Sequence, residues 1–215
     1  MSLKVDVRKL DLFNDIAREG SQTVAENLET LAGIEATMDV SKINFLQSSD
    51  LDAHIGTDDA VGIFVELIEP PNGYVLFVME PAASKSLAQA MVGGMDAEES
   101  TGGFTDMERS ALQEIGNIMT SGYVDGLANV LDTTIDISTP SFAYGPANQV
   151  VQKMGGWPDE DIAFVVDSTI LSPEADVELT VYTLPHVVEL VGLIQAIDLE
   201  TDVARDTTAS EEFVP

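Results

Sequence analysis

Residues 61–79 read VGIFVELIEPPNGYVLFVM, which is two apolar runs separated by a turn sequence. The runs cover residues 61–68 and 74–79, and Pro-Pro-Asn-Gly occupies residues 70–73 between them. Short runs rich in valine, isoleucine and aromatic side chains that flank proline, asparagine and glycine are typical of two strands joined by a turn. This stretch therefore predicts an antiparallel β-hairpin.

A second hairpin is predicted later in the chain. Its apolar runs are residues 162–170 and 177–184, and Ser-Pro-Glu at residues 172–174 separates them. A proline follows each hairpin, and proline is favoured at the first position of a helix. We expect helices from Pro81 to about residue 92 and from Pro185 to about residue 197. The two prolines are 104 residues apart.

A long amphipathic helix is predicted before each hairpin. Residues 10–31 and 107–131 each place apolar side chains on one helical face. The two segments align at an offset of 99 residues, which pairs Asp15 with Glu114. The order helix, strand, hairpin, helix thus occurs twice and implies an internal duplication. The apolar positions are Phe13, Ile16, Val24, Leu28 and Leu31 in the first helix, and Leu112, Ile115, Met119, Tyr123, Leu127 and Val130 in the second.

The duplicated pattern predicts an α+β domain with pseudo-two-fold symmetry. Two such units most simply join their hairpins into one continuous, mainly antiparallel sheet that carries two long and two shorter helices. The first repeat, with an acidic glycine-rich linker, spans residues 1–103, and the second spans residues 104–197. Residues 198–215 contain few apolar side chains and are expected to form an acidic tail.

The charge of the chain excludes several kinds of partner. The 215 residues include 38 acidic and 9 basic side chains, a formal net charge of -29, while 45% are hydrophobic, which is enough for a core. Nucleic acids and anionic membranes require basic surfaces, so neither is an expected partner. The excess of acidic side chains has two interpretations. It is either an adaptation to a halophilic cytoplasm, where salt screens the repulsion between these side chains, or an acidic docking surface. We favour the first interpretation and expect a halophilic archaeal source.

The chain has no cysteine, which excludes disulfides, thiol catalysis and thiolate metal sites. Its two histidines, His54 and His186, have no histidine partner nearby, so no metal site is expected. The first residues lack the apolar run of a secretory signal. Residues 179–197 are apolar but include proline, histidine, glutamate and glutamine, which disfavours a membrane-spanning helix. We therefore expect a soluble, cytoplasmic protein.

Polar side chains form a stripe on the second long helix, away from its apolar face. Ser110, Glu114 and Asn117 follow one another at spacings of four and three residues, and Ser121 extends the stripe. Asparagine both donates and accepts hydrogen bonds and can orient a water molecule, while a glutamate can accept from a cation or a hydroxyl group. The alternative interpretation is that these side chains only solvate the helix surface.

The stretch SALQEIGNI at residues 110–118, followed by Pro140, resembles the signature of the CheC family of chemotaxis phosphatases. That signature is Asp or Ser, three residues, Glu, two residues, Asn, about twenty-two residues and then Pro. Here 22 residues separate Asn117 from Pro140. The duplicated architecture is also similar to that of CheC proteins, over nearly the whole chain up to about residue 197.

The first half of the chain departs from this signature. Many CheC proteins carry a second copy on the first long helix, where this chain has Asp11, Asp15, Arg18 and Ser41 at the aligned positions. Arg18 has no acceptor atom and cannot hold a water as asparagine does, so it is expected to pair with Asp11 or Asp15 instead. We expect this first site to be inactive.

The resemblance implies that the chain speeds hydrolysis of the aspartyl phosphate of the response regulator CheY. It implies that Asn117 positions the attacking water, that Glu114 anchors the chain to the regulator's lysine, and that Ser110 and Pro140 support them. No cofactor is expected in this chain, because the Mg²⁺ belongs to the regulator. Two alternatives stay open: an adaptor that binds the deamidase CheD or CheY without hydrolysis, and a component related to flagellar switch proteins.

Overall fold

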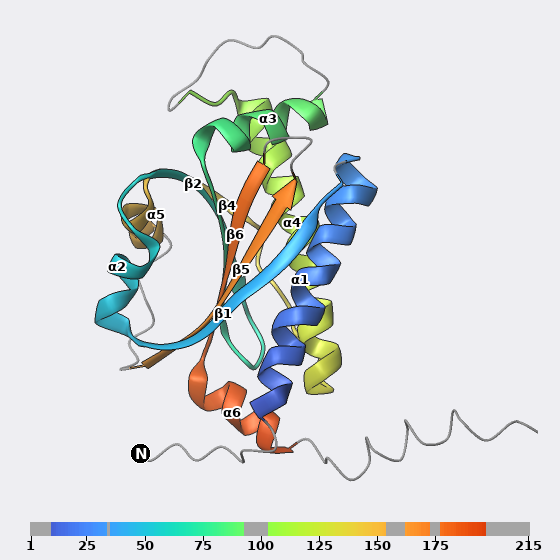
Figure 1. The fold of residues 1–215 in the computed structure, drawn as a ribbon, viewed down its shortest axis with the longest axis vertical. Helices are drawn as coiled ribbons and strands as arrows, with labels where there is room; N and C mark the ends of the chain where they lie inside the picture. Colours follow the sequence, from blue (N-terminus) through green and yellow to red (C-terminus); the bar gives the residue numbers. More distant parts are fainter. Residues whose placement is uncertain (1–9, 34, 93–102, 154–161, 173–176, 197–215) are drawn as a thin grey trace, which may run out of the picture.

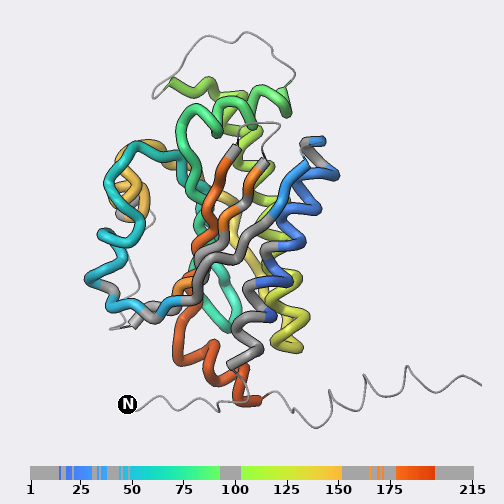
Figure 2. The backbone as a smooth tube through the Cα atoms, in the orientation of Figure 1, coloured from blue at the N-terminus to red at the C-terminus, as the bar shows by residue number. Residues whose placement is uncertain are grey.

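The computed structural model describes residues 10–33, 35–92, 103–153, 162–172 and 177–196 (Figures 1 and 2). The predicted tail and most of the predicted linker lie outside the described residues. The boundaries proposed for the two repeats therefore stay a prediction.

Within the described residues, six strands form one antiparallel sheet. They are β1 (Thr37–Gln47), β2 (Asp59–Leu67), β3 (Gly73–Met79), β4 (Ser141–Pro146), β5 (Ile162–Ser172) and β6 (Val177–Pro185). Their order across the sheet is β1-β5-β6-β3-β2-β4. Both predicted hairpins are confirmed, because β2 pairs with β3 and β5 pairs with β6, and β3 pairs with β6 at the centre.

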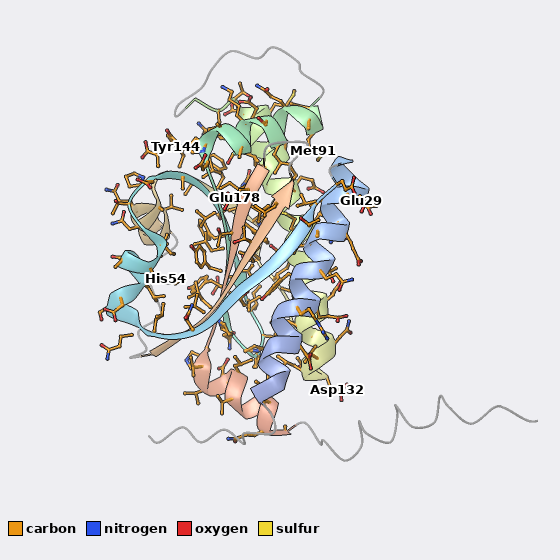
Figure 3. All side chains as sticks on the ribbon, viewed as in Figure 1. Glu29, His54, Met91, Asp132, Tyr144 and Glu178 are labelled. Carbon is orange, nitrogen blue, oxygen red and sulfur yellow. The ribbon has the colours of Figure 1, made fainter. Side chains whose placement is uncertain are left out.

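The four predicted helices are present, but the last begins at Val187 and not at Pro185, because Pro185 is the final residue of β6 and pairs with Gly73 of β3. The two long helices, α1 (Leu10–Ala32) and α4 (Asp106–Leu131), lie side by side along one face of the sheet (Figure 1). The two shorter ones, α3 (Pro81–Val92) and α6 (Val187–Ala196), lie at opposite ends of the molecule in this view. Side chains from all four helices and the sheet fill the main hydrophobic core between them (Figure 3).

Two further helices, which the sequence pattern does not predict, lie between the first strand of each half and its hairpin. Helix α2 (Leu51–Ile55) follows β1 after a 3-10 turn at Ser48–Asp50, and α5 (Ala147–Lys153) follows β4. Helices of five and seven residues are too short to show a helical period in the sequence. They cover the other face of the sheet, where Leu76 of β3 packs against Val150 and Val151 of α5.

The strand order is the one that a duplication would produce. Exchanging β1, β2 and β3 with β4, β5 and β6 reverses the order and leaves every neighbour unchanged. At the centre of the sheet Phe77 lies opposite Val181, 104 residues later, which is also the separation of Pro81 and Pro185. The pseudo-two-fold symmetry of the two halves itself stays a prediction.

Candidate functional site

Helix α4 carries the polar stripe, and side-chain and backbone contacts define both of its ends. Thr105 and Glu108 form a capping box: the Thr105 hydroxyl accepts from the Glu108 N–H at 3.1 Å, and the Glu108 carboxylate accepts from the Thr105 N–H at 2.8 Å. Asp132, labelled in Figure 3, ends the helix in a left-handed conformation with φ of 50°. A capping box satisfies backbone donors that would otherwise lack partners, so the helix begins at a defined residue.

The apolar face of α4 packs on the sheet as the sequence predicts. Leu112, Ile115, Met119, Tyr123 and Leu127 are buried, and Val130 is partly buried. Gly116 allows a close approach to β2, because a Cβ atom at this position would lie 2.4 Å from Cγ2 of Ile63. The helix therefore rests directly on the sheet at Gly116, which lies between the signature residues Glu114 and Asn117 in the sequence.

Helix α1 holds α4 from the side. The Asn27 side chain donates from Nδ2 to the backbone oxygen of Ile118 at 3.0 Å. A Cβ atom at Gly122 would lie 2.3 Å from the same Nδ2 atom, and one at Gly126 would lie 3.1 Å from the backbone nitrogen of Gly20. These small residues let the two long helices pack closely, which fixes α4 along its length.

The structure brings the four signature residues together in one groove. Ser110 and Glu114 are exposed, Asn117 is half-buried and Pro140 is buried, and all four line an open groove of about 450 Å³. Ser121, which extends the stripe in sequence, instead donates its hydroxyl to the backbone oxygen of Asn117 at 2.9 Å. Glu114 and Asn117 are thus adjacent on the wall of a groove that is open to solvent.

The opposite wall of the groove is the extended segment before β4. Of its residues, only Pro140 was a candidate from the sequence. Ile137, Ser138 and Thr139 line it together with Pro140. The segment is attached to β2 by an isolated bridge between Leu67 and Ile137. Gln113 of α4, also unpredicted, donates from Nε2 to the backbone oxygen of Pro140 at 2.9 Å and so joins the two walls. Helical spacing does not show which loop faces a helix, so no sequence signal indicated these residues.

The groove contains hydrogen-bonding groups but few charges. Its lining residues include one ionisable side chain, that of Glu114, together with the Asn117 and Gln113 carboxamides and three hydroxyl groups. Within the described residues, no three His, Asp or Glu side chains are placed to hold a metal ion. Such a lining can orient a water molecule and accept hydrogen bonds from a docked cation or hydroxyl group.

The aligned region of the first half has a different arrangement. Arg18 donates from Nη2 to Oδ1 of Asp15 at 3.2 Å, and the two side chains are 70% and 50% exposed. This confirms the expected pairing of Arg18 with a neighbouring aspartate. Asp11 lies in α1, and Ser41 lies in β1 where the register with β5 shifts, but their side chains are outside the described residues.

Comparison with known proteins assigns the chain to a family. The chain is 42% identical over 197 residues to a protein of Halobacterium salinarum named "Putative CheY-P phosphatase CheC1", and the alignment covers 92% of this chain and 100% of that protein. The chain belongs to the CheC-like family. The profile of this CheC-like family matches residues 107–144, which contain α4 and both walls of the groove.

One more distant relative and two solved structures are also similar to the chain. The "CheY-P phosphatase CheC" of Bacillus subtilis is 23% identical over 175 residues, covering 80% of this chain and 84% of that protein. The crystal structure of FliY from Thermotoga maritima superposes with a TM-score of 0.68 at 18% identity, covering 91% of this chain and 96% of that one. CheX from Vibrio vulnificus superposes with a TM-score of 0.53 at 15% identity, covering 80% and 97%. The two structural matches show a shared fold.

No helix among the described residues has the length and apolar character needed to cross a membrane.

Proposed function

We propose that this CheC-like chain is a chemotaxis phosphatase that hydrolyses the aspartyl phosphate of a CheY-type response regulator. The observation that carries the proposal is the groove itself, which contains all four signature residues, Ser110, Glu114, Asn117 and Pro140. The names of the two relatives support it, one being "CheY-P phosphatase CheC" and the other "Putative CheY-P phosphatase CheC1".

In this mechanism α4 docks on the phosphorylated regulator and Asn117 orients the attacking water. The water oxygen forms a bond to phosphorus, the bond between phosphorus and the aspartyl oxygen breaks, and the products are the free carboxylate and inorganic phosphate. Phosphoryl transfer depends mainly on positioning and charge stabilisation, and a carboxamide can supply the positioning. The Mg²⁺ that offsets the phosphate charge belongs to the regulator, so this chain contributes no metal.

The surroundings of Asn117 suit this task. Its side chain is half-buried, and the helix beneath it rests on β2 through Gly116 and on α1 through Asn27. A group held by a rigid helix keeps the orientation that a water molecule needs for in-line attack. Glu114 is exposed one turn away, where it can accept a hydrogen bond from the regulator's lysine.

We further propose that the first half has no working site. Arg18 replaces the asparagine, and its guanidinium group is engaged with Asp15. A guanidinium donates hydrogen bonds but accepts none, so it cannot hold a water in the orientation that hydrolysis requires. The working site is therefore the one on α4.

The test measures phosphate release from the cognate phosphorylated regulator with catalytic amounts of this chain. Asn117→Ala is expected to lower the rate by about 100-fold or more, the usual effect of losing one preorganised group. Asn129→Ala is the matched control, because Asn129 is exposed on the same helix but away from the groove. Full activity in Asn117→Ala together with loss of activity in Arg18→Ala would show that the working site has been misassigned.

The assay needs a series of KCl concentrations. With a net charge of -29, the acidic side chains repel one another and also repel the acidic phosphorylation pocket of a regulator. Salt screens both repulsions. We therefore expect the rate to rise as KCl increases. A rate that falls steadily with added KCl would favour the alternative in which the acidic surface itself attracts the partner.

The alternative function is a non-enzymatic adaptor that binds CheD or CheY. The loss of the signature around Arg18 and Asp15 favours it, since one of two sites is already changed. It predicts a stable complex with no change in the lifetime of the regulator's phosphate. Measuring both complex formation and phosphate lifetime distinguishes the two functions.

A further inference from the structure

We propose that Gln113 is a positioning residue that sets the distance between the two walls of the groove. It does so by holding the backbone oxygen of Pro140 at 2.9 Å from its own Nε2 atom. This inference rests on the proposed function, because it assigns Gln113 a part in docking the phosphorylated regulator.

Gln113 is placed to connect the site to the segment that faces it. It precedes Glu114 by one residue and Asn117 by four, so it lies one helical turn from the proposed water-positioning group. Its side chain is half-buried and lines the groove. Its hydrogen bond joins residues that are 27 positions apart in the chain, which makes it a tertiary contact between α4 and the opposite wall.

The segment that Gln113 holds is anchored to β2 on both sides of Pro140. Upstream, the backbone N–H of Ser138 donates to the oxygen of Glu66 at 2.9 Å, and the Ser138 hydroxyl accepts from the Glu66 N–H at 2.9 Å. Downstream, Ser141 enters β4 and pairs with Phe64 of β2. Between these anchors, Pro140 has no N–H group and cannot join the ladder as a donor. Its oxygen is the group through which Gln113 attaches the wall to α4.

This arrangement links Gln113 to docking and separates it from the chemical step. The groove is about 450 Å³ and open, and its width depends on the distance between α4 and Pro140. A loop of the regulator that enters the groove must fit that width. Loss of the hydrogen bond leaves Asn117 and Glu114 on their helix but frees Pro140 to shift between its two anchors. The expected effect is weaker docking with an unchanged rate in the docked complex.

The main experiment replaces Gln113 with methionine, which has a similar length and helix propensity but no donor. The KM for the phosphorylated regulator is expected to rise about 3- to 10-fold, the loss typical of one hydrogen bond, while kcat stays within about twofold. Gln113→Lys keeps a donor within reach of Pro140 and is expected to restore most of the affinity. Gln89→Met on the exposed surface of α3 is the matched control and is expected to change neither constant.

A second measurement tests the hydrogen bond between Gln113 and Pro140 without the regulator. Amide hydrogen exchange at residues 138, 139, 141 and 142 is expected to be about 3- to 10-fold faster in Gln113→Met than in the wild-type chain. Exchange in α4 is expected to stay the same. Absence of phosphatase activity in the wild-type chain would refute the proposed function, while the exchange result would still decide whether Gln113 holds the wall. Unchanged exchange, or a fall in kcat with unchanged KM, would overturn this inference.

Discussion

Replacing Gly116 with alanine is expected to destabilise the protein, although alanine is normally the better helix former. The new Cβ atom would lie 2.4 Å from Cγ2 of Ile63, closer than such atoms approach in proteins. Ile63 is fully buried in β2 and is β-branched, so it has little freedom to turn away. Overpacking of this kind costs about 1–3 kcal/mol. Alanine also has a helix propensity about 1 kcal/mol better than glycine, which offsets part of this cost, so we expect a net loss of up to about 2 kcal/mol.

Gly192→Ala in α6 provides the matched control. A Cβ atom there would have no neighbour within 4 Å, so only the gain in helix propensity remains. This variant is expected to be about 0.5–1 kcal/mol more stable than the wild-type chain. The same substitution thus has opposite signs on two helices of one protein, and the free energies of unfolding of the two variants should differ by about 2 kcal/mol.

The assay is urea denaturation followed by circular dichroism at one fixed high KCl concentration, with the slope checked for each variant. Activity toward the phosphorylated regulator should fall in Gly116→Ala, because Asn117 is the next residue on the displaced helix. Adding Ile63→Ala should recover part of the lost stability relative to the sum of the two single changes. A Gly116→Ala variant as stable as Gly192→Ala would refute the close seating of α4 on β2.

Three further outcomes follow from single contacts. Thr105→Ala removes the hydroxyl that accepts from the Glu108 N–H, so urea denaturation should show a loss of about 1–2 kcal/mol; an unchanged stability would argue against the capping box. Partial burial acts to raise the pKa of Glu189, but the backbone and side-chain N–H groups of Asn72 and a nearby histidine outweigh it and lower that pKa. Glu189→Ala should therefore cost about 1 kcal/mol at pH 7. That loss should persist above the ordinary pKa of 4.5 and shrink as the pH falls through the lowered value, which denaturation over a pH series will show. Arg18→Ala breaks only an exposed ion pair, so stability should change by less than about 0.5 kcal/mol and phosphatase activity should be retained.

The elements with strong local signals could be predicted from the sequence. Both hairpins, the long helices and the helix that begins at Pro81 have apolar runs or periods long enough to read, and the structure places them at nearly the predicted residues. Helices α2 and α5 were not predicted, because a helix of one or two turns is too short to show a helical period in the sequence. The exposure of Glu114 and the burial of the opposite face of α4 followed from the helical period alone.

The groove could be predicted only in part. The spacing in the sequence placed Ser110, Glu114 and Asn117 on one ridge, and the family resemblance added Pro140. No local sequence pattern indicated that Gln113 would contact that proline, because the contact depends on where the segment before β4 lies relative to α4. Contacts between distant segments of this kind are set by the tertiary fold and leave no mark on the local pattern.

The pairing of the edge strands explains why the half that departs from the signature is still needed. Strand β1 pairs with β5 of the other half, and β4 pairs with β2, so neither half completes a sheet from its own strands. The half that contains α1 can therefore depart from the signature but cannot lose its strands or its helix. We expect the two halves to unfold in one transition. If the chain is cut between them, each fragment should stay unfolded alone and regain structure only when both are mixed.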